Sequence, residues 1–313
     1  MDLKELITRK SKLLNAVPNK FLNSVERSQK ALFTEMISLL NKLKIENGHL
    51  VISQENYSIA AKISDDLKTV ILDSPYKESV KDFSLEFNEL KTINDKYFNI
   101  AYPEYAAPEV GAVIIDNAKR QTLNALLNTS IDNSFISPLA TVLDDAITSG
   151  ASFTETLKSI RLTIEGGVNA KGDEVDGKLL KYAKQIAHDN FAIADRSYTN
   201  SVADDLESEW FLYDGSEVLG SRCFCLERKG RYFHYKEIQA WGRGEKVGEC
   251  GKDWQGKNEN TNESTIFLLA GGYHCLDSIM PVSISIVPIA DIRRAMDLGY
   301  FEPSEFERAE LGL

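Results

Sequence analysis

The residues most able to do chemistry lie in the last third of the chain. They are the four cysteines and two nearby histidines: Cys223, Cys225, Cys250, Cys275, His234 and His274. Structural zinc sites need four thiolate or imidazole ligands in a tetrahedral arrangement. The candidate metal ligands are therefore Cys223, Cys225, Cys250, His274 and Cys275, with zinc as the candidate ion.

The spacing of these residues leaves three interpretations open. Zinc modules commonly present Cys-x2-Cys turns, whereas Cys223 and Cys225 are separated by one residue and His274 directly precedes Cys275. Thiols also pack in cores as small apolar groups, and the spacing favours this second interpretation. In the third, Cys225 and Cys275 contact each other, bonded or not, although a disulfide is not expected in a reducing cytoplasm.

Signatures of catalysis are not found in the sequence. The glycine pairs at 166–167 and 271–272 lack the Lys-Ser/Thr ending of a phosphate-binding loop. A cysteine nucleophile needs a base and a third orienting group, and His234 is as readily a strand surface residue as a base. We therefore expect no enzyme, with no catalytic and no cofactor-binding residues.

Charge and hydropathy further narrow the classes of protein to which the chain can belong. The 313 residues include 36 Lys and Arg against 47 Asp and Glu, a net charge of -11. Affinity for nucleic acid comes mostly from phosphate neutralisation, so this balance argues against DNA binding as the main role. No stretch approaches the roughly 20 apolar residues that span a bilayer, and the first residues do not resemble a signal peptide. We expect a protein of the cytoplasm with no membrane partner.

Apolar residues at spacings of three and four predict a series of helices in the first two hundred residues. The predicted ranges are 22–44, 53–71, 80–90, 110–127, 139–147, 152–164 and 179–206. Ser53 is the expected N-cap of one helix, and Ser152 with Glu155 the expected capping box of another. Charged residues of the last helix, among them Asp195 and Arg196, are expected to face solvent.

The last third changes character. Aromatic and β-branched runs predict strands at 210–213, 231–234, 265–269 and 282–287, with a short helix at 236–241. The fold class expected is α+β, a mainly α-helical N-terminal body followed by a small mixed α+β module. The expected domains are an N-terminal helical region (1–100), a helical domain (109–207), a Cys- and aromatic-rich module (208–290) and a charged helical tail (291–313). The proline-containing segment 101–108 is the expected connector between the first two.

Three segments of this module carry a family resemblance: Ser221 to Trp241, Trp254-Gln-Gly256, and Gly271 to Val282. They resemble the end of the phage head morphogenesis family, the Mu F-like minor head proteins of tailed bacteriophages. The resemblance covers about residues 140–290 and includes Asp195-Arg-Ser-Tyr198. By position, Cys225 and Cys275 correspond to the family's cysteine pair and Arg222 to its arginine.

The chain departs from the family pattern at one place. Where the family has Asn-Cys-Arg-His, this chain has His274-Cys275-Leu276-Asp277. The family's terminal histidine is thus replaced by Asp277, and a histidine stands directly before the cysteine instead. Neighbouring residues on a strand point to opposite faces, which separates His274 from Cys275 if this segment is extended.

The resemblance implies a virion structural protein, a minor head component associated with the portal or the capsid interior. Its implied partners are the portal protein and the major capsid or scaffolding proteins, with packaged DNA as a further candidate through the basic segment 228–231. It also implies several copies or a homo-oligomer, located in the virion and in the host cytoplasm during assembly. The alternative is a head-packaged protein ejected with DNA, including a zinc-binding enzyme.

Overall fold

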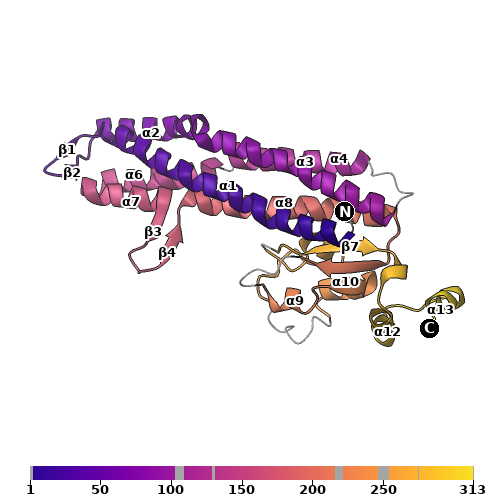
Figure 1. Cartoon of the computed structure of the whole chain (residues 1–313). Helices are drawn as coiled ribbons and strands as arrows, with labels where there is room; N and C mark the ends of the chain where they lie inside the picture. Colours follow the sequence, from indigo (N-terminus) through magenta and orange to yellow (C-terminus); the bar gives the residue numbers. More distant parts are fainter. Residues whose placement is uncertain are drawn as a thin grey trace. The chain divides into compact units, whose positions relative to one another are not determined.

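A computed structural model describes most of the chain. The described residues are 3–102, 109–128, 131–215, 221–245, 254–273 and 275–312. The fold class predicted from the sequence is confirmed: a mainly helical body is followed by a small mixed α+β module (Figure 1). Of the predicted connector at 101–108, Ala101 is helical and residues 103–108 lie outside the described residues.

The chain divides into two compact units that are discontinuous in sequence. The sheet unit comprises Met1–Ala16, Phe87–Ala118 and His188–Leu313, and the helical unit comprises Val17–Glu86 and Lys119–Ala187. Four long helices contribute residues to both units: α1 (Leu3–Leu40), α3 (Pro75–Ala101), α4 (Glu109–Leu127) and α8 (Lys178–Asp205). This division differs from the four consecutive ranges expected from composition, because it cuts the long helices rather than the segments between them.

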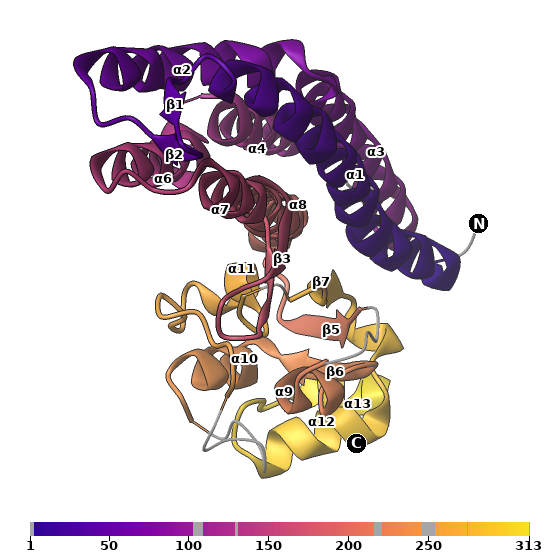
Figure 2. The same cartoon turned by 90° about the vertical axis from the view of Figure 1, so that its left-hand side faces the viewer.

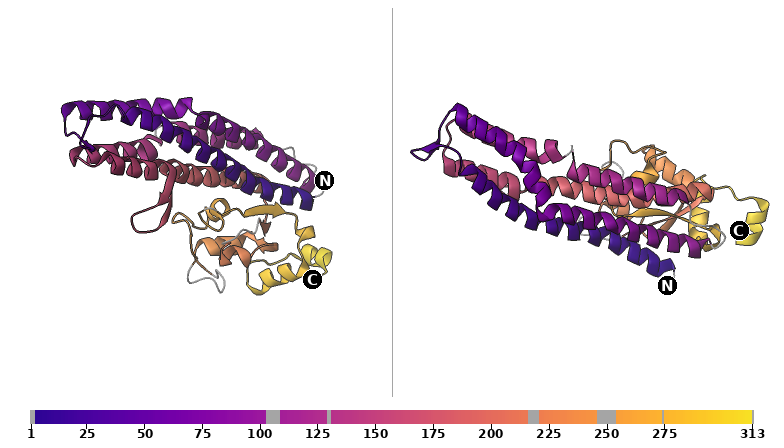
Figure 3. Two further views of the ribbon diagram at one scale, coloured as in Figure 1. Left: turned by 60° about the vertical axis from the view of Figure 1, so that its left-hand side comes forward. Right: turned by 90° about the horizontal axis from the view of Figure 1, so that it is seen from above.

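The helical unit is built on apolar stripes at helical spacing. Besides its parts of the long helices it contains α2 (Gln54–Asp73), the π-helical turn η1 (Asp132–Ile136), α6 (Ser137–Thr148) and α7 (Phe153–Glu165) (Figure 3). Leu67, Leu143 and Ile160 are among its buried side chains. All lie within ranges predicted as helices, since the 3.6-residue period places them on one face.

Local signals explain several helix ends. The Ser53 hydroxyl accepts a hydrogen bond from the Asn56 amide and caps α2, as predicted. Pro75 opens α3, where its missing N–H is no loss. The predicted capping box of α7 was wrong: Ser152 precedes the helix, but its side chain makes no capping hydrogen bond. Gly166 ends α7 with a φ of 80°, a conformation that favours glycine.

Two short antiparallel hairpins belong to the helical unit. One pairs β1 (Ile45–Glu46) with β2 (His49–Leu50), and the other pairs β3 (Gly166–Val168) with β4 (Glu174–Asp176). The second hairpin stands out from the end of α7 as a two-stranded ribbon. No strand was predicted there from the sequence, because strands of three residues leave little period-two signal.

The sheet unit contains a three-stranded antiparallel sheet in the order β6-β5-β7 (Figure 2). The strands are β5 (Trp210–Asp214), β6 (Arg231–His234) and β7 (Ser278–Val282). The short helices around them are α9 (Cys223–Leu226), α10 (Tyr235–Gly242), α11 (Ile266–Leu269), η2 (Ile284–Ile286), α12 (Ile289–Asp297) and α13 (Glu305–Leu311). The strands predicted at 210–213 and 231–234 and the helix at 236–241 are confirmed.

Two predicted strands were wrong. Residues 266–269 form helix α11, because the Asn262 side chain accepts from the Thr265 amide and turns the chain at the helix start. Of the range 282–287 only Val282 lies in a strand, and 284–286 form a 3-10 turn. The Ser283 hydroxyl accepts from the Ser285 amide there, which competes with strand pairing.

The sequence predicts residues 291–313 as a charged helical tail. In the structure, part of this segment is packed against the rest of the sheet unit. Ile292 and Ala295 on α12 are buried. Arg294 on the same helix donates a 2.6 Å hydrogen bond to the Tyr232 carbonyl on β6. The Phe301 ring packs edge-on against Trp210 of β5. Helix α12 and the chain after it therefore belong to the packed part of the sheet unit.

Candidate functional site

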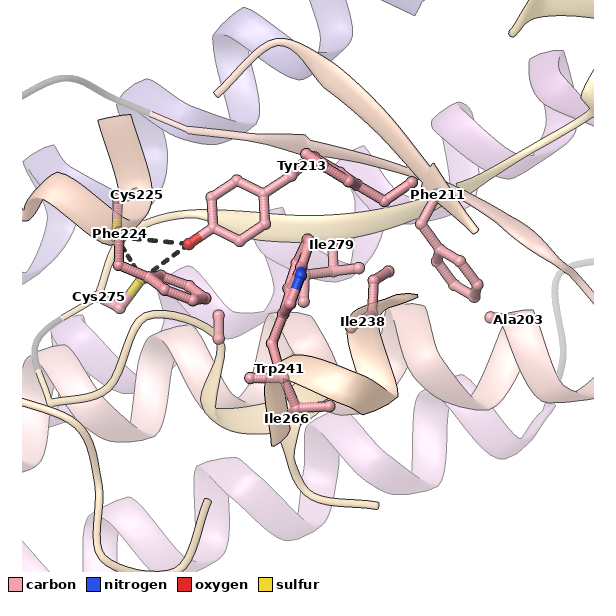
Figure 4. Close-up of a cluster of buried hydrophobic side chains, with 12 residues drawn as sticks. Ala203, Phe211, Tyr213, Phe224, Cys225, Ile238, Trp241, Ile266, Cys275 and Ile279 are labelled. Carbon is pink, nitrogen blue, oxygen red and sulfur yellow. Dashed lines mark hydrogen bonds between the residues drawn. The ribbon is translucent and has the colours of Figure 1, made fainter. Parts of the chain in front are cut away.

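Two free thiols, a carboxylate and a phenol meet inside the sheet unit. Cys225 on α9 and Cys275 before β7 place their sulfurs 3.9 Å apart (Figure 4). The Tyr213 hydroxyl on β5 lies 3.4 Å from the Cys225 sulfur and 3.3 Å from Asp277 Oδ2. The Cys275 sulfur lies 3.5 Å from the same carboxylate oxygen. We call Tyr213, Cys225, Cys275 and Asp277 the thiol–carboxylate cluster.

Strand register and aromatic packing hold the cluster together. Tyr213 pairs with Ile279 and Asp214 with Ser278, so the residues just before β7 reach the end of β5. Phe224, next to Cys225, stacks on Trp254 with ring centroids 4.0 Å apart. The Trp254 indole donates a 2.9 Å hydrogen bond to the Gly271 carbonyl. The aromatic side chains thus fix α9 against the segment that carries Cys275.

Glycine is required at position 271 because the sulfurs approach the backbone. A Cβ at Gly271 would lie 2.4 Å from the Cys225 sulfur and 3.0 Å from the Cys275 sulfur. The Gly271 amide donates to the Cys275 sulfur at 3.3 Å. Such an amide stabilises negative charge on the sulfur, so the backbone favours a thiolate at Cys275.

A buried arginine stands beside the cluster. Arg196 on α8 is only 4% exposed and donates to the main-chain carbonyls of Asp277 (3.1 Å), Leu268 (3.0 Å) and Cys275. The prediction that this side chain faces solvent was wrong, since periodicity cannot reveal that carbonyls of a distant segment surround a helix position. Arg196 brings a positive charge close to Cys275 and orders the chain that carries two cluster residues.

The two thiols differ in acidity. The pKa of Cys275 is lowered to about 7 by the hydrogen bond from Cys225 and by the Arg196 charge, against the opposing effect of burial. The pKa of Cys225 is raised, because its proton is held in the hydrogen bond to Cys275 and because the group is buried. Burial, followed by the charges of Cys275 and Asp277, raises the pKa of Tyr213 well above its ordinary value. The first negative charge on the thiol pair therefore belongs to Cys275.

The predicted metal ligands are only partly brought together. Cys225 and Cys275 are in contact and unbonded, as the third interpretation allowed. Cys223 is disulfide-bonded and is therefore not one of the free thiols. Cys250 and His274 lie outside the described residues.

Sequence reasoning missed two members of the cluster. The sequence predicts Tyr213 only as an aromatic residue of a strand. Asp277 could have been identified from the sequence, because it stands where the resembled family has its terminal histidine. Within the described residues, Cys225, Cys275 and Asp277 are the one group with ligand atoms close enough to hold a metal ion.

A second buried ionic group lies elsewhere in the sheet unit. Lys10 of α1 and Asp195 of α8 form a 3.1 Å ion pair with side chains 4% and 0% exposed. Asp195 also accepts from Asn94 at 2.9 Å and from Ser278 at 2.7 Å. The prediction of a solvated Asp195 was therefore wrong. This network ties three helices and β7 together and has the character of a structural element.

His234 is buried among aromatic side chains at the end of β6. Its ring packs against Trp210, Tyr235 and Phe301, and its side chain is 1% exposed. Burial, aided by the Lys236 charge, lowers the pKa of His234 to about 4. The imidazole is consequently neutral at pH 7 and serves as a packed core group at the end of β6.

The cluster is closed to solvent. Tyr213 is 0%, Cys275 4%, and Cys225 and Asp277 6% exposed. Four acidic groups at this spacing can share protons or hold a cation, but they leave no open position for a substrate.

Comparison of the chain with protein-family models, with curated proteins and with solved structures found no match. None of the described helices combines the length and the apolar composition that a bilayer crossing needs.

Proposed function

We propose that this protein is a virion structural protein, a minor head component that associates with the portal or the capsid interior. The proposal starts from the resemblance to Mu F-like minor head proteins. It gains support from where the resembling residues lie in the structure.

The observation that carries the proposal is the convergence of the resembling segments. Arg196, Cys225, Trp254, Gly271 and Cys275 come from four such segments and meet around one buried point. Residues separated by up to 79 positions thereby specify the inside of one folding unit. The resembling residues thus make the contacts that hold this folding unit together. Such a role suits a protein that acts by docking.

The burial of the cluster also favours a structural role over an enzymatic one. Catalytic sites keep a position open to substrate, whereas all four cluster side chains are at most 6% exposed. The proposed protein therefore performs no reaction at this site and requires no cofactor for one.

The proposed partners are the portal protein and the major capsid or scaffolding proteins. The net charge of -11 favours basic protein surfaces and opposes close approach to DNA phosphates. Packaged DNA remains the partner of the second candidate, an ejected protein, through the segment Arg228–Arg231. Repeated copies around a portal would follow from the ring symmetry of such assemblies.

Co-purification tests the association. The full chain is expressed together with a phage portal protein from the genome that encodes the chain, and the complex is isolated through a tag on the portal. We expect the chain to be retained at physiological salt, and retention by the major capsid protein alone would place it on the shell instead. Release from both, combined with steeply salt-dependent binding to duplex DNA, would contradict the proposal and favour the ejected protein.

A further inference from the structure

We propose that Tyr213, Cys225, Cys275 and Asp277 together bind one structural zinc ion. This ligand set differs from the one expected from the sequence, since it includes a carboxylate and a phenol and omits Cys223. It goes beyond the proposed function, which holds with or without a metal.

The positions of the four ligand atoms match a zinc tetrahedron. Zinc–sulfur bonds of about 2.3 Å and zinc–oxygen bonds of about 2.0 Å require sulfurs about 3.8 Å apart, sulfur–oxygen pairs about 3.5 Å apart and oxygens about 3.3 Å apart. The sulfurs of Cys225 and Cys275 are 3.9 Å apart. The Asp277 oxygen lies 3.5 Å from the Cys275 sulfur and 3.3 Å from the Tyr213 oxygen.

Two further edges lie on either side of the expected 3.5 Å. The Tyr213 oxygen lies 3.4 Å from the Cys225 sulfur and 4.0 Å from the Cys275 sulfur. The ligand atoms of Cys225 and Asp277 lie within 4.8 Å of each other, so this last edge closes by a small side-chain movement when an ion binds. The two thiols and the Asp277 carboxyl bind the ion in their deprotonated forms, and Tyr213 binds it as a neutral phenol.

The charge of the surroundings suits a bound dication. Two thiolates and one carboxylate carry three negative charges, of which zinc offsets two. The guanidinium of Arg196, bound to the Cys275 and Asp277 carbonyls, offsets the third. The Gly271 amide donates to the Cys275 sulfur, as outer partners of metal-bound thiolates do. Without a cation, this interior buries two thiols, a phenol and a carboxyl group beside the two arginines Arg196 and Arg228.

The chemistry of the ligands selects zinc among common ions. Two thiolates exclude Mg²⁺ and Ca²⁺, which take oxygen ligands, and a tetrahedral arrangement with sulfur is typical of Zn²⁺. Because the site is closed, the ion would be structural. It would link β5, α9 and the segment before β7, which are up to 64 residues apart in sequence.

Metal analysis of the full chain tests the proposal directly. The protein is expressed with added zinc, purified under reducing conditions without chelators, and its zinc content and free thiols are measured. We expect about one zinc per chain. Replacing zinc by Co²⁺ should produce thiolate-to-cobalt charge-transfer absorption and the intense visible bands of tetrahedral cobalt. No zinc or cobalt uptake, with both thiols reduced, would show a hydrogen-bonded cluster and overturn the proposal.

Variants identify the ligands. Cys225→Ser and Cys275→Ser should abolish stoichiometric zinc, and Asp277→Asn should weaken zinc binding by about 100-fold or more, since even outer partners contribute about 10–100-fold. Tyr213→Phe should weaken it about tenfold. Asp291→Asn and Tyr232→Phe, which alter a carboxylate on α12 and a phenol on β6, are the matched controls and should keep the wild-type affinity.

Circular dichroism of each variant establishes that it folds. If Asp277→Asn and Tyr213→Phe are folded and keep full zinc affinity while His274→Ala loses it, the ion has other ligands and the proposed set is wrong. Portal association is measured separately, so failure of the zinc site and failure of the proposed function give different results.

Discussion

The helical unit and the sheet unit fill their interiors with different residues. In the described part of the helical unit the buried polar residues are uncharged: Ser28, Gln29, Asn56, Ser84, Thr122 and Thr156. In the sheet unit they include charged or titratable groups: Lys10, Asp195, Arg196, Arg228, His234, Glu237 and Asp277. The first interior is organised by apolar periodicity, and the second by specific polar pairs.

This difference shows which of the two interiors depends on particular residues. A buried charge is tolerated only where a partner and hydrogen bonds compensate its desolvation, so each such residue fixes the position of another segment. Arg228 illustrates this, because its guanidinium carbon lies 4.4 Å from the ring centroid of Trp241 on α10. The sheet unit is thus specified residue by residue.

The largest expected effect comes from breaking the buried ion pair of the sheet unit. Asp195→Ala leaves Lys10 charged and without its carboxylate, so the free energy of unfolding should fall by about 3–5 kcal/mol. Urea denaturation of the full chain measures it. Glu89→Ala is the control, because its pair with Arg9 is 36% and 51% exposed and should contribute at most about 1 kcal/mol. Equal effects of the two substitutions would contradict a special role for buried charge.

In the helical unit, the largest effects should come from apolar side chains. Leu67→Ala on α2 removes a side chain that is 2% exposed and should lower the free energy of unfolding by about 2–5 kcal/mol. Val168→Ala, at a position 69% exposed on β3, should change it by no more than about 0.5 kcal/mol. The same denaturation experiment applies. A small effect at Leu67 would mean that the predicted apolar face does not form the core.

The pH dependence of stability should report on His234. Its folded-state pKa of about 4 lies below the ordinary value of 6.5, so the unfolded chain takes up the proton first. The stability contributed by neutral His234 is full above about pH 6.5 and is lost as the pH falls toward 4, by at most about 3 kcal/mol. His234→Phe should flatten this part of the stability–pH curve. An unchanged curve in His234→Phe would contradict this assignment.

A smaller effect is expected at Gly271. Gly271→Ala places a Cβ 2.4 Å from the Cys225 sulfur, so the cluster must shift, and the free energy of unfolding should fall by about 1–3 kcal/mol. The rate at which a thiol reagent modifies Cys225 and Cys275 should rise in the native protein. Gly172→Ala, where a Cβ meets nothing within 4 Å, should leave that rate unchanged. Unchanged thiol protection in both variants would show that the cluster does not depend on close backbone approach.

The sequence predicted what depends on local spacing. Helical periodicity located the long helices, although α1 begins at Leu3 and the predicted helix began only at residue 22. Ser53 capped α2 as expected, because a cap involves residues a few positions apart. The strands at 265–269 and 282–287 were predicted wrongly, because apolar content there outweighed the turn chemistry of Asn262 and Ser283.

The candidate site was only partly predictable for a related reason. Cysteine spacing and the family resemblance together identified Cys225 and Cys275 as a pair. Tyr213 and Asp277 join them only through the register of β5 with β7, a contact across 64 residues that no local pattern encodes. Burial of Asp195 and Arg196 likewise depends on segments far away in sequence.

The central claim, that this chain serves as a structural part of a phage head, is tested most directly by mass spectrometry of purified particles. Particles are produced by the virus or prophage that encodes the chain, and its peptides are quantified against those of the portal and major capsid proteins. The account predicts that the chain is present in every preparation, at a few to tens of copies for each portal. Its complete absence from intact, DNA-filled particles and from their assembly precursors would contradict the account.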